Sequence, residues 1–194
     1  MCSSDLYASN YSYAQRILAV IYNITTGPSI RIFNSRVSSL WSHGKGLEIR
    51  RSMKEYMKVS LPLLLLSIIV SYFLVPEVLG RLGSRNLSAS DISGIQFLFL
   101  CLAAWYLVLA SETAFTIIGI ASKNSAIFIK CNTVFSLIYF AVAFGTKGHL
   151  GIYAIPLGLF LGQTANLASY SAYAFKLLKT RGGTPAWTAR DTSR

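Results

Sequence analysis

The chain has 194 residues, of which 53% are hydrophobic and only 13% are charged, and its mean hydropathy is +0.50. Soluble domains carry about twice that share of charged residues, so the composition excludes an ordinary soluble protein and is typical of a membrane protein. The net charge of +11 does not indicate nucleic-acid binding, because the basic residues flank apolar blocks instead of forming a mixed basic and aromatic face.

Residues 1–6, Met-Cys-Ser-Ser-Asp-Leu, resemble the translation of a common sequencing adaptor. We expect them to be a non-native leader, which would make the chain the C-terminal part of a longer protein. The expected organisation is this leader, a helical membrane domain over 7–179 and a polar cytoplasmic tail over 180–194.

Five apolar segments are long enough to cross the hydrocarbon layer of a bilayer, about 30 Å thick, as helices. They cover 11–37, 59–79, 92–121, 126–145 and 150–178. The expected fold class is therefore all-α, a polytopic membrane protein. Between the first two segments, apolar residues at helical spacing among basic ones predict a short amphipathic helix within 38–58, lying on the membrane surface.

The basic residues divide the connecting segments into two sets. Lysine and arginine are abundant in 36–58, 123–130 and 176–194, whereas the alternate side carries only Arg81, Arg85 and Lys147. Because basic loops are retained on the cytoplasmic side, the first set and the C-terminus are predicted to be cytoplasmic.

No catalytic motif is present in the sequence. It contains no phosphate-binding loop, no zinc-protease motif and no nucleophile elbow, and its two histidines have no partners at metal-ligand spacing. Cys101 and Cys131 lie in apolar segments and are interpreted as packing residues. We expect neither enzymatic activity nor a metal or cofactor.

Three charged residues fall inside the predicted spans: Arg16 and Arg31 in the first, and Glu112 midway along the third. Arg31 is close enough to the cytoplasmic end to extend its side chain to the lipid headgroups. Arg16 and Glu112 lie deeper, where an unpaired charge is costly. Either they form an ion pair that ties two helices together, or both face an aqueous cavity. In that cavity Arg16 would bind an anionic headgroup, and Glu112 would tune the site or couple transport to a proton or cation.

Glycine and proline add two further predictions. Gly27-Pro28 interrupts the first span, because proline removes a backbone hydrogen bond, and the pair is either a hinge or a static kink. Gly158 and Gly162 are four residues apart in the last span, which predicts close packing against another helix.

The first span carries a recognisable arrangement: Tyr13-Ala14-Gln15-Arg16, an apolar run, Pro28 and then Ser35-Arg36 before a basic loop. This arrangement is similar to the eighth membrane helix of bacterial lipid II flippases, which belong to the multidrug, oligosaccharidyl-lipid and polysaccharide exporter superfamily. The segment 147–179, with its glycine-led start and basic end, resembles the twelfth helix of the same family.

The resemblance implies that the chain holds helices eight to twelve, most of the C-terminal lobe of a transporter in the bacterial cytoplasmic membrane. Arg16 would meet the diphosphate of a lipid-linked oligosaccharide, with Arg31 and Glu112 as further candidates. The missing N-terminal half would be the partner. An O-antigen or capsule exporter and a multidrug antiporter are alternatives within the superfamily, and a small membrane scaffold subunit is the alternative outside transport.

Overall fold

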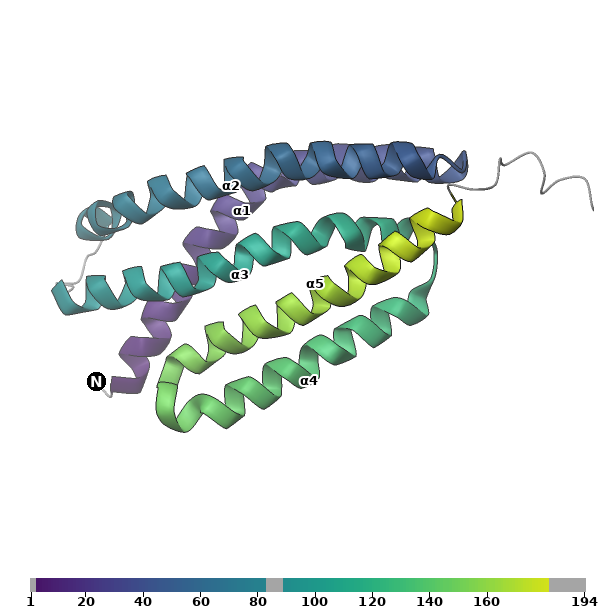
Figure 1. Cartoon of the computed structure of the whole chain (residues 1–194). Helices are drawn as coiled ribbons and strands as arrows, with labels where there is room; N and C mark the ends of the chain where they lie inside the picture. The colour runs from purple at the N-terminus through teal and green to yellow at the C-terminus, as the bar shows by residue number, and fades with distance from the viewer. Residues whose placement is uncertain (1–2, 83–88, 182–194) are drawn as a thin grey trace, which may run out of the picture.

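The chain is described by a computed structural model over residues 3–82 and 89–181 (Figure 1). All elements in these two ranges are helices, so the expected all-α class is confirmed. They are α1 (Ser3–Ser42), α2 (Gly46–Leu82), α3 (Ala89–Ala121), α4 (Ser125–Leu150), the short 3-10 helix η1 (Gly151–Tyr153) and α5 (Ala154–Arg181). Cys2, Arg85 and most of the expected tail over 180–194 lie outside the described residues.

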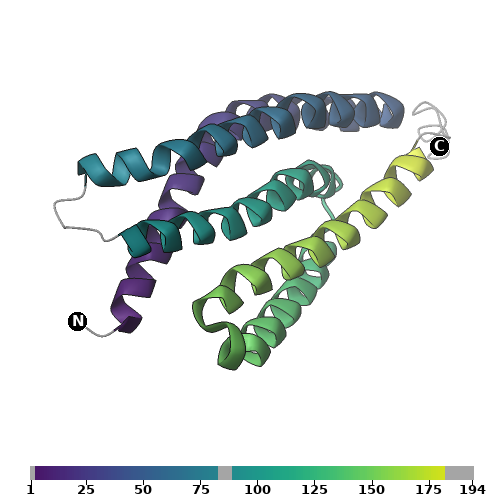
Figure 2. The same cartoon turned by 60° about the vertical axis from the view of Figure 1, so that its left-hand side comes forward.

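Two helical hairpins lie on either side of α3 (Figure 1 and Figure 2). One hairpin is α1 with α2 and the other is α4 with α5, and α3 packs against α1, α2 and α5, whereas α4 packs mainly on α5. The N-terminal part of α1 crosses behind α3, and its C-terminal part runs beside α2. The central position of α3 makes it the helix through which the two hairpins are joined.

The prediction of a separate surface helix within 38–58 is wrong, because α2 is continuous from Gly46 to Leu82. The reason is the spacing of its buried side chains, which follow one another at three or four residues along the whole helix. These side chains are Ile49, Met53, Tyr56, Ser60, Leu64 and Ile68. One uninterrupted buried stripe favours one straight helix over two helices at an angle. Gly44, in a left-handed conformation with φ of 71°, forms the turn that ends α1.

Three stretches of the described residues are long and apolar enough to cross a membrane: Gly46–Glu77, Ile92–Ala121 and Ala126–Thr180. These stretches make the chain compatible with a membrane protein. The third one contains both α4 and α5, which fold back on each other at η1. α1, expected to span over 11–37, is not among the three stretches.

The buried side chains form two clusters, and α3 contributes to both. The first cluster joins α1 and α2 to the N-terminal half of α3, with Leu18, Leu64 and Phe99 among its fully buried members. The second joins the adjoining ends of α1 and α2 to α4, α5 and the C-terminal end of α3, with Ile118 and Tyr170 inside it. The outer face of α2 is instead apolar and exposed, as expected for a face that meets lipid. Its exposed side chains include Leu63, Leu66, Ile69, Val70 and Phe73.

The predicted close packing at Gly158 and Gly162 is confirmed. A Cβ atom added at Gly158 would lie 3.0 Å from the carbonyl oxygen of Tyr139, and one added at Gly162 would lie 3.0 Å from Cδ2 of Phe135. Both neighbours belong to α4. The two glycines therefore allow the backbones of α4 and α5 to approach each other closely.

Replacing Gly162 should separate α4 from α5. We expect Gly162→Ala to lower the melting temperature of the detergent-purified protein, with a loss of roughly 1–3 kcal/mol typical of overpacking. Gly145→Ala is the matched control, because a Cβ atom there would have no neighbour within 4 Å and alanine favours a helix. Equal melting temperatures for Gly162→Ala and Gly145→Ala would contradict the packing role.

Candidate functional site

The most deeply buried charged group of the described residues is the carboxyl of Glu112 on α3, whose side chain is 6% exposed. Thr116, one turn further along, donates its hydroxyl to Oε1 at 2.9 Å. From α5, Gln163 donates its side-chain amide to Oε2 and Asn166 donates to Oε1 at 3.4 Å. Side chains on both helices therefore satisfy the carboxyl, as a buried polar group requires.

The hydrogen bonds continue beyond the carboxyl. Trp105, two turns before Glu112 on α3, donates its indole N–H to Oε1 of Gln163 at 3.3 Å. We call Trp105, Glu112, Thr116, Gln163 and Asn166 the amide cluster. Its donors to Glu112 are all neutral, and Oδ1 of Asn166 is buried with no hydrogen-bond partner among the described residues. The amide cluster ties α5 to α3 without supplying any positive charge.

Arg16 does not belong to this cluster. Its side chain is exposed on α1, and none of the ion pairs within the described residues includes Arg16 or Glu112. The rotation of α1 explains why. Beside Glu112, α1 contacts α3 through Tyr22, whose hydroxyl lies 3.1 Å from Oγ1 of Thr113. Arg16 lies about 120° around the helix from Tyr22 and therefore faces away from α3. The direct ion pair between Arg16 and Glu112 is therefore not formed.

Arg16 instead belongs to an exposed polar face of α1. Arg31 is also exposed and lies on the same face, as do Asn23 and Asn34, because these positions are separated by seven, eight and three residues. Val20, 57% exposed, lies among them. We call Arg16, Asn23, Arg31 and Asn34 the polar face of α1. The two asparagines were not identified from the sequence, although their helical spacing from the arginines is a signal that reveals them. From Arg16 to Arg31 the face extends about 22 Å along the helix.

Gly27 and Pro28 lie beside this face. Pro28 is inside α1 and cannot bond to the carbonyl of Ile24, while the hydroxyls of Thr25 and Thr26 bond to the carbonyls of Ile21 and Tyr22 at 2.7 and 2.6 Å. α1 changes direction partway along its length, and we attribute the bend to Pro28. A Cβ atom at Gly27 would have no neighbour within 4 Å, so this side of α1 is open, although Thr26 beside it is fully buried.

The charged and amide side chains of these residues can bind polar or charged groups. Within the described part of the chain no group of three histidine, cysteine or carboxylate side chains is placed to hold a metal ion. Cys101 and Cys131 are free thiols. The two charged groups of the site are the exposed guanidinium of Arg16 on α1 and the carboxyl of Glu112, which is hydrogen-bonded between α3 and α5.

Comparison of the chain with models of protein families, with curated proteins and with solved structures finds no match.

The amide cluster predicts a specific order of stabilities. Glu112→Leu removes both acceptor oxygens and leaves the amides of Gln163 and Asn166 buried without a partner, which costs about 1–3 kcal/mol for each lost group. Glu112→Gln keeps one acceptor and supplies a donor that can reach Oδ1 of Asn166. We therefore expect the melting temperature in detergent to fall much further for Glu112→Leu than for Glu112→Gln. The reverse order would show that the hydrogen bonds do not hold α5 on α3.

Proposed function

We propose that this chain is part of a membrane transporter that moves a lipid-linked saccharide across the bacterial cytoplasmic membrane. The lipid would be a polyprenyl diphosphate, with its headgroup in a protein cavity and its tail in the bilayer. Movement would occur by alternating access, with no covalent bond made or broken. The observation that supports this proposal best is the polar face of α1.

The polar face of α1 is not suited to contact with lipid. Two arginines and two asparagines at hydrocarbon depth are costly unless they meet water or protein. The exposed face of α2 is, by contrast, apolar along the same depth. The simplest arrangement has α2 against lipid and the polar face of α1 against a water-filled cavity.

Arg16 has the chemistry that a diphosphate needs. Its guanidinium is exposed and forms no ion pair within the described residues, so its donors remain available. A guanidinium holds two phosphate oxygens at once and stays charged at all physiological pH values. Arg31, at the far end of the same face, would meet the headgroup when it reaches the cytoplasmic side.

The proposed transmembrane arrangement has five crossings, one for each of α1 to α5. α4 has 26 residues and α5 has 28, which correspond to about 39 and 42 Å, enough to cross the hydrocarbon layer. The basic connections after α1 and α3, with Lys45 and Lys123, and the basic end of α5 would lie in the cytoplasm. The bend at Pro28 would serve as a hinge of α1, since the break leaves one backbone carbonyl unbonded.

A cavity lined by α1 needs a second wall. We propose that another helical bundle of the same transporter, its N-terminal half, faces the polar face of α1. An O-antigen or capsule exporter, or a multidrug antiporter of the same superfamily, would use the same arrangement with a different cargo. A scaffold subunit, in contrast, would need no water-filled face.

Whether transport requires the positive charge of Arg16 is tested by complementation. In bacteria depleted of their own lipid flippase, we expect the full-length protein to restore growth and Arg16→Ala to reduce transport about tenfold or more, the effect of losing one charge-assisted contact. Arg16→Lys should retain part of the activity. Lys130→Ala, which removes one exposed charge from α4, is the control. Full transport by Arg16→Ala would refute the diphosphate role, and no growth with a correctly inserted wild type would favour the scaffold.

Whether the polar face of α1 is in contact with water is tested by thiol labelling. With the native cysteines replaced by alanine, Asn23→Cys should react in intact cells with a maleimide that cannot cross membranes, because Asn23 is on the polar face of α1. Val70→Cys, 49% exposed on the outer face of α2, should remain unlabelled in lipid. Protection of both cysteines would contradict the cavity.

A further inference from the structure

A groove between α1 and α2 lies on a different side of α1 from the polar face. It encloses about 180 Å³ and is lined at one end by Arg36 and Glu55 and at the other by Ser29 and Ser60. Arg36 is five residues after Arg31, about 140° around the helix. The groove is therefore separate from the face assigned to transport.

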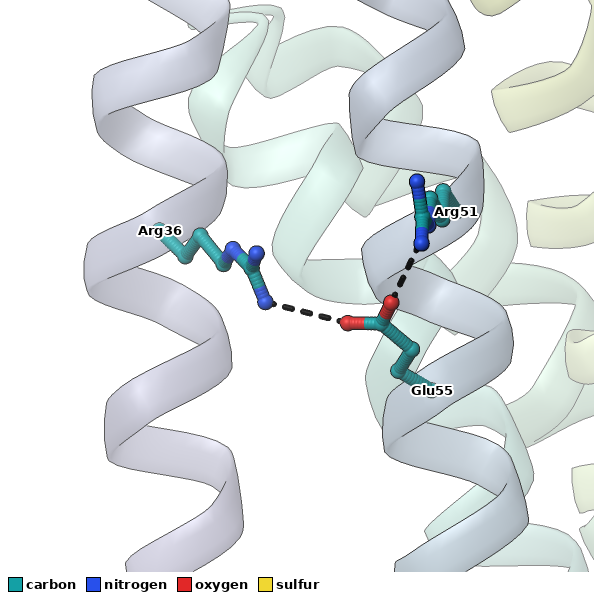
Figure 3. Close-up of polar contacts among 3 residues, drawn as sticks. All are labelled: Arg36, Arg51 and Glu55. Carbon is teal, nitrogen blue, oxygen red and sulfur yellow. Dashed lines mark hydrogen bonds and ion pairs between the residues drawn. The ribbon is translucent and has the colours of Figure 1, made fainter.

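The mouth of the groove is formed by two arginines that share one carboxylate (Figure 3). Nη1 of Arg36, on α1, lies 3.0 Å from Oε2 of Glu55, and Nε of Arg51, on α2, lies 3.3 Å from Oε1. These contacts use one N–H group of each guanidinium, which has five donors. One positive charge and several donors remain uncompensated at the mouth.

The side chains at the mouth can change partner at little cost. Those of Arg36, Glu55 and Arg51 are 58%, 48% and 84% exposed. Ion pairs with this exposure contribute little to stability, because solvent screens them. A phosphate could therefore join the two arginines without breaking a stabilising contact.

More positive charge surrounds the mouth on α2. Lys54 and Lys58 are exposed there, with Glu48 as the other nearby acid on this helix, whereas Arg50 lies over the ring of Phe175 on α5, 5.8 Å from its centroid. Basic residues close to a membrane surface attract anionic lipids, by about 1 kcal/mol for each lysine or arginine. The charge at this end of the hairpin thus favours an anionic partner from the adjoining leaflet.

The inner end of the groove carries an unsatisfied polar atom. Ser60 is fully buried, and its Oγ has no hydrogen-bond partner among the described residues. A hydroxyl with no exposure cannot touch a lipid bound at the surface, so the groove ends at Ser60. Ile32 and Val59, which are 70% and 61% exposed, flank the groove, and the exposed apolar face of α2 continues beyond them. The charge at the mouth and the apolar surface beyond it follow one another in the order of the headgroup and acyl chains of a phospholipid.

We propose that the groove between α1 and α2 binds an anionic phospholipid of the cytoplasmic leaflet. Arg36 and Arg51 bind its phosphate, and an acyl chain lies along the outer face of α2. The site depends on α1 and α2 lying in the membrane and not on transport. The bound lipid would hold the hairpin together at the end where its two helices meet.

Binding is measured by thermal shift and native mass spectrometry of the detergent-purified chain with added phosphatidylglycerol or phosphatidylcholine. We expect phosphatidylglycerol to bind and to raise the melting temperature, and phosphatidylcholine to do neither. Arg36→Ala should weaken the apparent affinity for phosphatidylglycerol about tenfold, with Arg36→Lys in between. Lys130→Ala, which removes an exposed charge from α4 outside the groove, should bind as the wild type does.

Ser60→Ala provides a second variant that leaves the surface charge unchanged. It should fold as well as the wild type and should bind phosphatidylglycerol as tightly, since it removes a buried hydroxyl that does not reach the surface of the groove. Arg16→Ala should bind this lipid normally, which separates the groove from the transport proposal.

Three results would overturn the proposal. The first is equal binding of the two lipids, and the second is an equal loss in Lys130→Ala and Arg36→Ala, which would indicate general attraction of charge instead of a site. The third is the same stabilisation by inorganic phosphate alone, which would make the ligand a free anion and not a lipid.

Discussion

A carboxyl group buried in the central helix must find hydrogen-bond donors, and this requirement determines how the second hairpin is attached. Glu112 accepts hydrogen bonds from Gln163 and Asn166 of α5, so α5 can pack on α3 only in the register that brings these amides to the carboxyl. α4 then follows α5, because Gly158 and Gly162 allow the two backbones to approach closely. The hydrogen bonds to Glu112 thus position α5, and the pair of glycines positions α4.

The first hairpin is attached mainly by apolar packing. α1 and α2 place Leu18 and Leu64 against the α3 residues Leu98 and Leu102, all fully or almost fully buried. Its polar contacts with α3 include the hydroxyl pair of Tyr22 and Thr113 and a hydrogen bond from Tyr56 to the carbonyl of Ala110 at 3.4 Å. Apolar contacts are less directional than hydrogen bonds, so this side of α3 is better able to tolerate a rotation of α1. A helix that bends at Pro28 during transport would need that tolerance.

Two basic regions on α1 have different surroundings and, in our proposals, different ligands. Arg16 and Arg31 lie on the polar face and form no ion pair within the described residues, which suits the proposed headgroup that must bind and leave. Arg36 shares Glu55 with Arg51, and the apolar wall of α2 continues from its groove, which suits a lipid that stays. A single bent helix would therefore meet cargo on one side and structural lipid on the other.

By itself, the sequence determined the helical class, the apolar segments, the glycine packing of α5 and the candidate charges, because composition and the spacing of side chains along one helix are local properties. The spacing of side chains along the sequence also indicates that α2 is continuous and that two asparagines share a helix face with Arg16. Neither feature was predicted from it. Only the tertiary structure decided that Gln163 and Asn166, not Arg16, meet Glu112. Each residue turns a helix by about 100°, so the side chains that meet across two helices depend on the rotation and register of both. Those are set by the packing of the whole bundle around α3.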